Sequence, residues 1–160
     1  MNPEIKRDLA PQSEAIENIL ESAHDISESL NALKVDRNKS RIFEDTGVRI
    51  EIYPNDERAR GVYMCIRGGK DIVVGVIHGG HEHFDSTNLQ DDVAGKALAY
   101  FKALLHAKQV TTDKLKHGKL VSRDTLFKNG DDVLSESMES EVLLNIFSST
   151  TVEIYEFSFL

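Results

Sequence analysis

The sequence contains one cysteine, no long apolar run and fewer basic than acidic residues. Cys65 cannot form an internal disulfide, and a lone cysteine is typical of a protein in a reducing compartment. The polar N-terminus lacks the apolar segment of a signal peptide. The longest apolar runs, such as residues 72–77, are far shorter than the ~20 residues of a membrane-spanning helix. We therefore expect a cytoplasmic protein with no membrane partner.

Basic residues are fewer than acidic ones, and the two kinds are unevenly distributed along the chain. Nineteen Lys and Arg stand against 27 Asp and Glu, a net charge of −8, which argues against a nucleic-acid partner because phosphate binding needs Lys and Arg. Residues 102–128 carry seven bases and two acids, whereas residues 129–160 carry seven acids and no base. Unpaired like charges of this kind can steer a basic protein partner. The alternative is a solvated acidic surface partly paired with the basic segment.

The length of 160 residues and the 40% apolar content predict a single globular domain over residues 1–160. Apolar residues alternate in several short segments, which indicates strands. Because strands and helices do not alternate regularly, we expect an α+β fold with an antiparallel sheet of about four to six strands packed against two or three helices. The predicted strands are residues 48–53, 62–66, 72–77 and 151–159.

Helical periodicity appears in three places. Apolar residues recur at steps of three and four in residues 13–33 and again in residues 89–107. A third helix is predicted at residues 135–147, with a strand at residues 142–147 as the alternative. Residues 110–127 alternate weakly around Gly118 and predict a hairpin.

Residues 78–85 are rich in histidine and acidic residues. If this segment is extended, His81, His83 and Asp85 lie on one face, where two imidazoles and a carboxylate can form a metal triad. The spacing resembles the zinc motif of metallo-β-lactamase-like hydrolases, in which a histidine follows the aspartate; here Ser86 follows. A small metal-dependent enzyme is thus an alternative function. We favour a structural interpretation, in which a strand end turns through a glycine pair, and expect no bound metal.

No other residues have the spacing of a catalytic site. Cys65 lies in the apolar run 62–66, where a thiol behaves as a small buried hydrophobic group. The segment 68–71 contains Gly-Lys but lacks the glycine spacing and the Ser or Thr of a phosphate-binding loop. The sequence therefore predicts a protein that is not an enzyme and holds no cofactor.

Size, acidity and the order of segments resemble those of bacterial immunity proteins, which neutralise polymorphic or contact-dependent toxins. The resemblance rests on the Glu-His-Phe-Asp run at residues 82–85, on the Ala- and Leu-rich helix at residues 97–105 and on the basic hairpin after it. It implies a protein that binds a toxin and occludes its active site or substrate surface. An acidic inhibitor suits a toxin that is a basic enzyme.

We predict that the partner binds the acidic C-terminal segment, which is preferred over the acidic first helix because residues 129–160 contain no base. A further alternative is an adaptor or regulatory subunit whose first helix docks on another protein. The predicted partner-binding residues are Asp131, Asp132, Glu136, Glu139 and Glu141.

Overall fold

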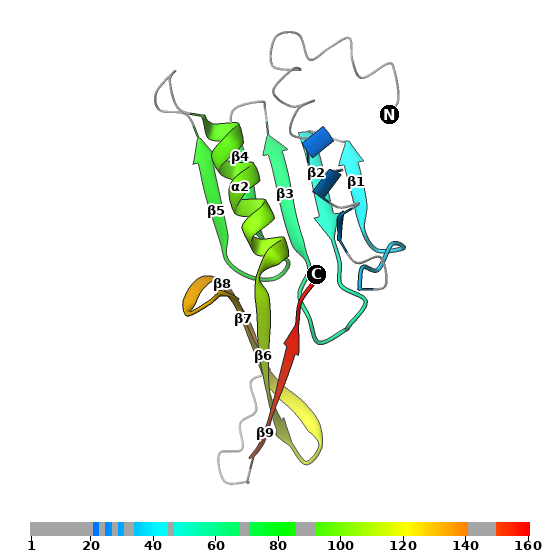
Figure 1. Cartoon of the computed structure of the whole chain (residues 1–160). Coiled ribbons are helices and arrows are strands. Elements are labelled where there is room, and N and C mark those ends of the chain that lie inside the picture. Colours follow the sequence, from blue (N-terminus) through cyan, green and yellow to red (C-terminus); the bar gives the residue numbers. More distant parts are fainter. Residues whose placement is uncertain are drawn as a thin grey trace.

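A computed structural model of the chain describes residues 21–22, 25–26, 29–30, 34–44, 47–67, 71–85, 92–140 and 150–160. These residues form two antiparallel sheets and one helix, which confirms the α+β class. The first sheet has the order β1-β2-β3-β4-β5 and the second the order β8-β7-β6-β9 (Figure 1). The elements are β1 (Arg41–Glu44), β2 (Gly47–Ile52), β3 (Val62–Arg67), β4 (Asp71–Val76), β5 (His81–Asp85), α2 (Val93–His106), β6 (Lys108–Lys116), β7 (Lys119–Asn129), β8 (Asp132–Ser140) and β9 (Thr150–Phe157).

The first sheet is a meander in which each strand pairs with the next along the chain. Side chains alternate between the two faces of a strand, so one face of this sheet collects the apolar residues. The register aligns Ile50, Met64 and Val74 across that face, and all three are buried. The structure confirms the three strands predicted between residues 48 and 77, each to within one residue at its ends.

Helix α2 covers the apolar face of the first sheet. Its start is defined by Asp92, whose side chain accepts a hydrogen bond from the backbone N–H of Gly95 at 2.8 Å. The predicted helical periodicity is confirmed, because the residues at steps of three and four point into the core. The buried residues of α2 are Ala97, Phe101, Leu104 and Leu105. Among the described residues, no helix is both long and apolar enough to cross a membrane.

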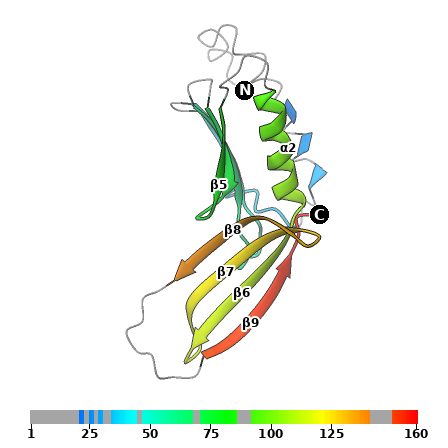
Figure 2. The same ribbon diagram turned by 90° about the vertical axis from the view of Figure 1, so that its left-hand side faces the viewer.

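The second sheet starts where α2 ends. Ala107 leaves the helix in an extended conformation, with φ −66° and ψ 144°, and β6 begins at the next residue. His117 and Gly118 join β6 to β7, and both have the positive φ that a two-residue hairpin turn requires. The predicted hairpin around Gly118 is therefore confirmed. In Figure 2 this sheet extends beyond the lower end of α2.

The two sheets share one hydrophobic core near the end of α2. Phe127 of the second sheet is fully buried in the same cluster as Phe101 and Val74. Phe159, just after β9, is also fully buried there and packs edge to face on Phe157, with ring centroids 5.2 Å apart. The second sheet is thus anchored by aromatic side chains at one end, while its other end extends away from α2.

The third predicted helix is wrong where the structure describes it. Residues 135–140 belong to β8, in which Ser135 and Ser137 face one side and Glu136 and Met138 the other. This alternation suits a strand beside β7, and the helical spacing of Met138 with later residues misled the prediction. The rest of that segment, including the alternative strand at residues 142–147, lies outside the described residues.

The closing strand was predicted in the same sheet as residues 48–77, and that assignment is also wrong. β9 pairs with β6 along its whole length, so the described strands form two sheets instead of one. α2 is the one helix whose bounds the structure describes, in place of the two or three expected, and residues 21–22, 25–26 and 29 of the predicted first helix are also helical. The predicted helix at residues 13–33 falls largely outside the described residues. Of its described residues, Leu30 is buried in the core and Ile26 packs against it.

We expect Phe101→Ala to lower the free energy of unfolding by about 3–5 kcal/mol, because it removes a fully buried ring from beneath α2. The neighbouring Lys102 is exposed, so Lys102→Ala should change stability by less than about 0.5 kcal/mol. Urea unfolding followed by circular dichroism measures both. Equal midpoints for the two variants would show that the face of α2 is wrongly assigned.

Candidate protein-interaction surface

The two faces of the second sheet lie in different environments. Pairing across its four strands places one row of residues on the face that we call the inner face: Tyr155, Thr111, Thr125 and Ser137. The next row lies on the opposite, outer face: Ile154, Thr112, Asp124 and Met138. The central residues of the inner row are buried, whereas both ends of the outer row are exposed.

The inner face is covered by the β2–β3 loop, residues 53–61. Gln109 on β6 forms two hydrogen bonds with the backbone of Arg60, accepting from its N–H at 2.8 Å and donating to its carbonyl at 3.0 Å. Thr111 donates to the carbonyl oxygen of Arg58 at 3.1 Å. Buried polar side chains require such partners. The polar residues of the inner face are therefore used to attach the loop.

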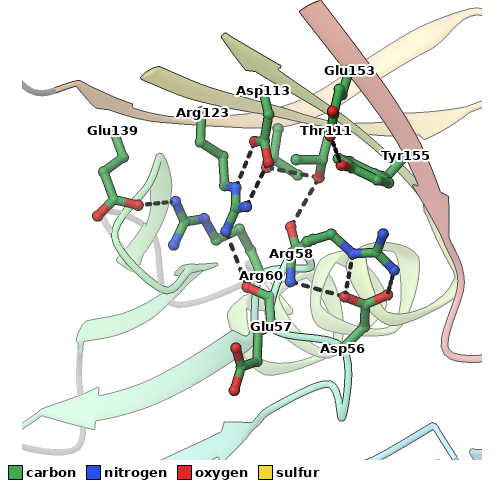
Figure 3. Close-up of polar contacts among 11 residues, drawn as sticks. Asp56, Glu57, Arg58, Arg60, Thr111, Asp113, Arg123, Glu139, Glu153 and Tyr155 are labelled. Carbon is green, nitrogen blue, oxygen red and sulfur yellow. Dashed lines mark hydrogen bonds and ion pairs between the residues drawn. The ribbon is translucent and has the colours of Figure 1, made fainter. Parts of the chain in front are cut away.

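A buried ion pair lies at the centre of this contact (Figure 3). The guanidinium of Arg123 donates to both carboxylate oxygens of Asp113, at 2.7 and 2.6 Å, and its third nitrogen donates to the carbonyl oxygen of Glu57 at 3.2 Å. Asp113 is only 4% exposed. The hydrogen bonds that Arg123 donates to the carboxylate of Asp113 raise the pKa of Arg123. The planar guanidinium thus joins β6, β7 and the β2–β3 loop in one arrangement.

Glu139, one of the predicted partner-binding residues, is also engaged on the inner face. Its carboxylate accepts a hydrogen bond from the guanidinium of Arg60. That hydrogen bond, together with the charge of Arg60, holds the pKa of Glu139 below its ordinary value of 4.5. Glu139 therefore has a structural partner within the chain.

The strand conformation separates the other predicted acidic residues. Glu136 is exposed on the outer face, on the opposite side of β8 from Glu139. Asp131 and Asp132 are exposed at the turn between β7 and β8. Glu141 lies outside the described residues. The predicted acidic set therefore does not form one surface, because a strand directs successive side chains to opposite faces.

The outer face carries apolar side chains that nothing covers among the described residues. Met138 is 73% exposed, Ile154 65%, Val152 53% and Val133 51%. They stand on β8 and β9, the two edge strands, with the half-buried Val110 and Leu126 among the residues between them on β6 and β7. Apolar side chains gathered on one face of a sheet mark an interaction surface more often than scattered single ones do.

The histidine segment forms β5, an edge strand of the first sheet. His81, His83 and Asp85 alternate along it on one face, as an extended segment requires, and all three are exposed. The Nδ1 atom of His83 lies 3.2 Å from a carboxylate oxygen of Asp71 on β4. No three His, Cys, Asp or Glu side chains of the described residues are close enough together to hold a metal ion.

The second face of the first sheet carries polar contacts between residues of that sheet and the residue that follows β2. Cys65 is buried there, as its apolar context predicted. Beside it, the buried carboxylate of Glu51 accepts hydrogen bonds from Arg49 at 2.6 Å and from the hydroxyl of Tyr53 at 3.2 Å. The guanidinium of Arg49 also lies over the ring of Tyr63, 4.5 Å from its centroid.

Comparison of the chain with protein-family models, curated proteins and solved structures finds no match. Function is therefore inferred from the arrangement of the chain's own residues.

The sequence prediction missed the outer face of the second sheet. The exposure of Val152 and Ile154 depends on the pairing of β9 with β6, which lies far from β9 in the sequence. A signal was present in residues 151–159, where the apolar positions change from one face to the other. Phe157 packs against the core, while Val152 and Ile154 point outward.

We expect Asp113→Ala to lower the free energy of unfolding by about 3–5 kcal/mol, because it leaves the charge of Arg123 poorly solvated and unpaired. Asp132→Ala, the same substitution at an exposed position, should change stability by less than about 0.5 kcal/mol. Chemical unfolding measures both variants. A small effect at Asp113 would mean that the ion pair contributes little to the stability of the contact between the inner face and the β2–β3 loop.

The Arg60–Glu139 contact should weaken in acid. The folded-state pKa of Glu139 is lowered, so its contribution to stability is present above its ordinary pKa and is lost as the pH falls through the folded value. A double-mutant cycle with Arg60→Met and Glu139→Gln should give a coupling energy of up to about 1 kcal/mol at neutral pH. The coupling should approach zero in strong acid. A coupling energy that does not change with pH would contradict the assignment.

Proposed function

We propose that the chain is a protein-binding module that uses the outer face of the second sheet, and that it acts as an immunity protein for a basic bacterial toxin. The observation that carries the proposal is the exposure of four apolar side chains on this one face, Val133, Met138, Val152 and Ile154. A stable interface combines apolar and polar side chains, and this face carries apolar ones along both edge strands with polar ones beside them.

The polar rim of the outer face favours a basic partner. Glu136 is exposed at the β8 edge, and Asp131 and Asp132 are exposed at the adjoining turn. None of these three side chains forms an ion pair among the described residues. The same face also carries Lys108, Lys114 and Lys128, of which Lys108 pairs with Glu156 at 2.7 Å and Lys114 with Asp124 at 3.9 Å. The net charge of −8 adds a long-range attraction for a basic protein.

The toxin-inhibitor part of the proposal rests on the resemblance to immunity proteins and on the absence of a metal cluster from the described residues. Such an inhibitor needs only a surface that occludes a toxin's active site. The outer face is suited to this task, since the first sheet and α2 support the second sheet from its other side.

The test begins with capture of the partner from the native host by the full chain. Each captured protein is then produced alone and together with this chain in a bacterial test strain. We expect one captured protein to arrest growth alone and to become harmless in the presence of the chain. A partner that is harmless alone would overturn the immunity function while leaving a binding module.

The same partner tests the surface. Reversing Asp131, Asp132 and Glu136 to Lys should slow association by about tenfold or more at low salt, because charges at the rim steer the encounter. The matched control reverses Glu21, Glu82 and Asp85, which are equally charged and also exposed. Surface plasmon resonance at two salt concentrations measures the association rate of each variant. Equal slowing by the two triple variants would show that the net charge of the chain, and not the outer face, determines the association rate.

A further inference from the structure

The two sheets have four edge strands, and three of them are protected. β1 has only four residues, and β5 has five residues that include Glu82 and Asp85. β8 is contacted from outside its sheet, because the N–H of Gly80 donates to the carbonyl oxygen of Glu136 at 2.9 Å. Short length, charge and coverage are the usual ways in which proteins prevent pairing at a sheet edge.

β9 shares only one of these protections, the charge of Glu153 and Glu156; it is not short, and among the described residues no backbone hydrogen bond reaches it from outside its sheet. It has eight residues, and β6 is its only pairing partner among the described strands. In an antiparallel ladder alternate residues direct their N–H and C=O groups away from the neighbouring strand, so β9 presents a row of them at its open edge. Val152 and Ile154 stand exposed beside that edge on the outer face. β-branched residues of this kind suit pairing with another strand.

We propose that the open edge of β9 accepts an extended, basic strand from a protein partner, which continues the second sheet by one strand. The partner's backbone pairs with β9, and its alternate side chains lie on the two faces of the sheet. On the outer face they meet Val152 and Ile154, and on the inner face they meet Glu153. The strand therefore alternates apolar with basic residues.

The charges around β9 select a basic strand. Each guanidinium in Figure 3 is paired with a carboxylate: Arg58 with Asp56, Arg60 with Glu139 and Arg123 with Asp113. At the β9 edge, Glu153 is bonded only to the hydroxyl of Tyr155 among the described residues. A Lys or Arg opposite Glu153 would supply the missing counter-charge.

A second copy of the chain is a poorer occupant of the same edge. It would bring its own Glu153 and Glu156 to the edge, and each copy carries a net charge of −8. Like charges across a strand pair are destabilising, and the repulsion between whole domains adds to this. Self-association is therefore an outcome that the test must distinguish.

This inference deepens the proposed function, because it specifies how the partner attaches to the second sheet. The probe is a capped seven-residue peptide that alternates Lys and Val, and the control peptide replaces every Lys by Glu. Binding to the full chain is followed by NMR and amide hydrogen exchange. We expect the Lys peptide to slow exchange at alternate residues of β9 and to shift the amide signals of residues 150–157. The Glu peptide should do neither.

Two variants separate edge pairing from general binding to the outer face. Ile154 and Met138 are the two ends of one row across the sheet and are similarly exposed, but only Ile154 lies on β9. Ile154→Lys should weaken binding of the Lys peptide by about tenfold or more, whereas Met138→Lys should change it by less than about threefold.

Several results would overturn the inference. Equal losses in the two variants would place the peptide on the whole outer face, which contradicts edge pairing and leaves the proposed function intact. Peptide signals confined to residues outside β9 would contradict it as well. Dimerisation of the chain through β9, detected by sedimentation at increasing concentration, would assign the edge to a second copy.

Discussion

The buried ion pair between Asp113 and Arg123 is the contact on which the arrangement of the two sheets depends. One guanidinium bonds a carboxylate on β6 through two nitrogens and the β2–β3 loop through the third. A bidentate contact fixes both distance and plane, so it restrains the angle between loop and sheet more than an apolar contact would. The second sheet can therefore extend beyond α2 and still keep one orientation.

This attachment determines which surfaces remain available for a partner. The first sheet buries one face against α2, and on its other face the carboxylate of Glu51 is bonded to Arg49. The inner face of the second sheet is occupied by the β2–β3 loop. Its outer face has no such cover among the described residues. Exposed apolar residues there are consequently a feature of the architecture, because among the described residues α2 packs on the first sheet and no helix covers the outer face of the second.

Acidic residues serve two purposes in this molecule, and charge alone does not distinguish them. Asp113 and Glu139 neutralise arginines inside the contact between the sheets. Asp131, Asp132 and Glu136 stand exposed without an ion-pair partner among the described residues. Both groups lie within or beside strands of the same sheet. The difference between them is the face toward which each side chain points, and that is set by strand pairing.

The sequence by itself determined the α+β class, strands β2 to β4, the hairpin at Gly118 and the buried face of α2, because apolar periodicity is a local property. Only the tertiary structure decided that β8 is a strand and that β9 belongs to a second sheet. In β8 the inward residues are Ser135, Ser137 and Glu139, which carry no apolar signal, and the partner of β9 lies about forty residues away in sequence. The candidate surface was predictable only as an acidic C-terminal segment. Its separation into an occupied inner face and an exposed outer face follows from long-range register, which no local pattern encodes.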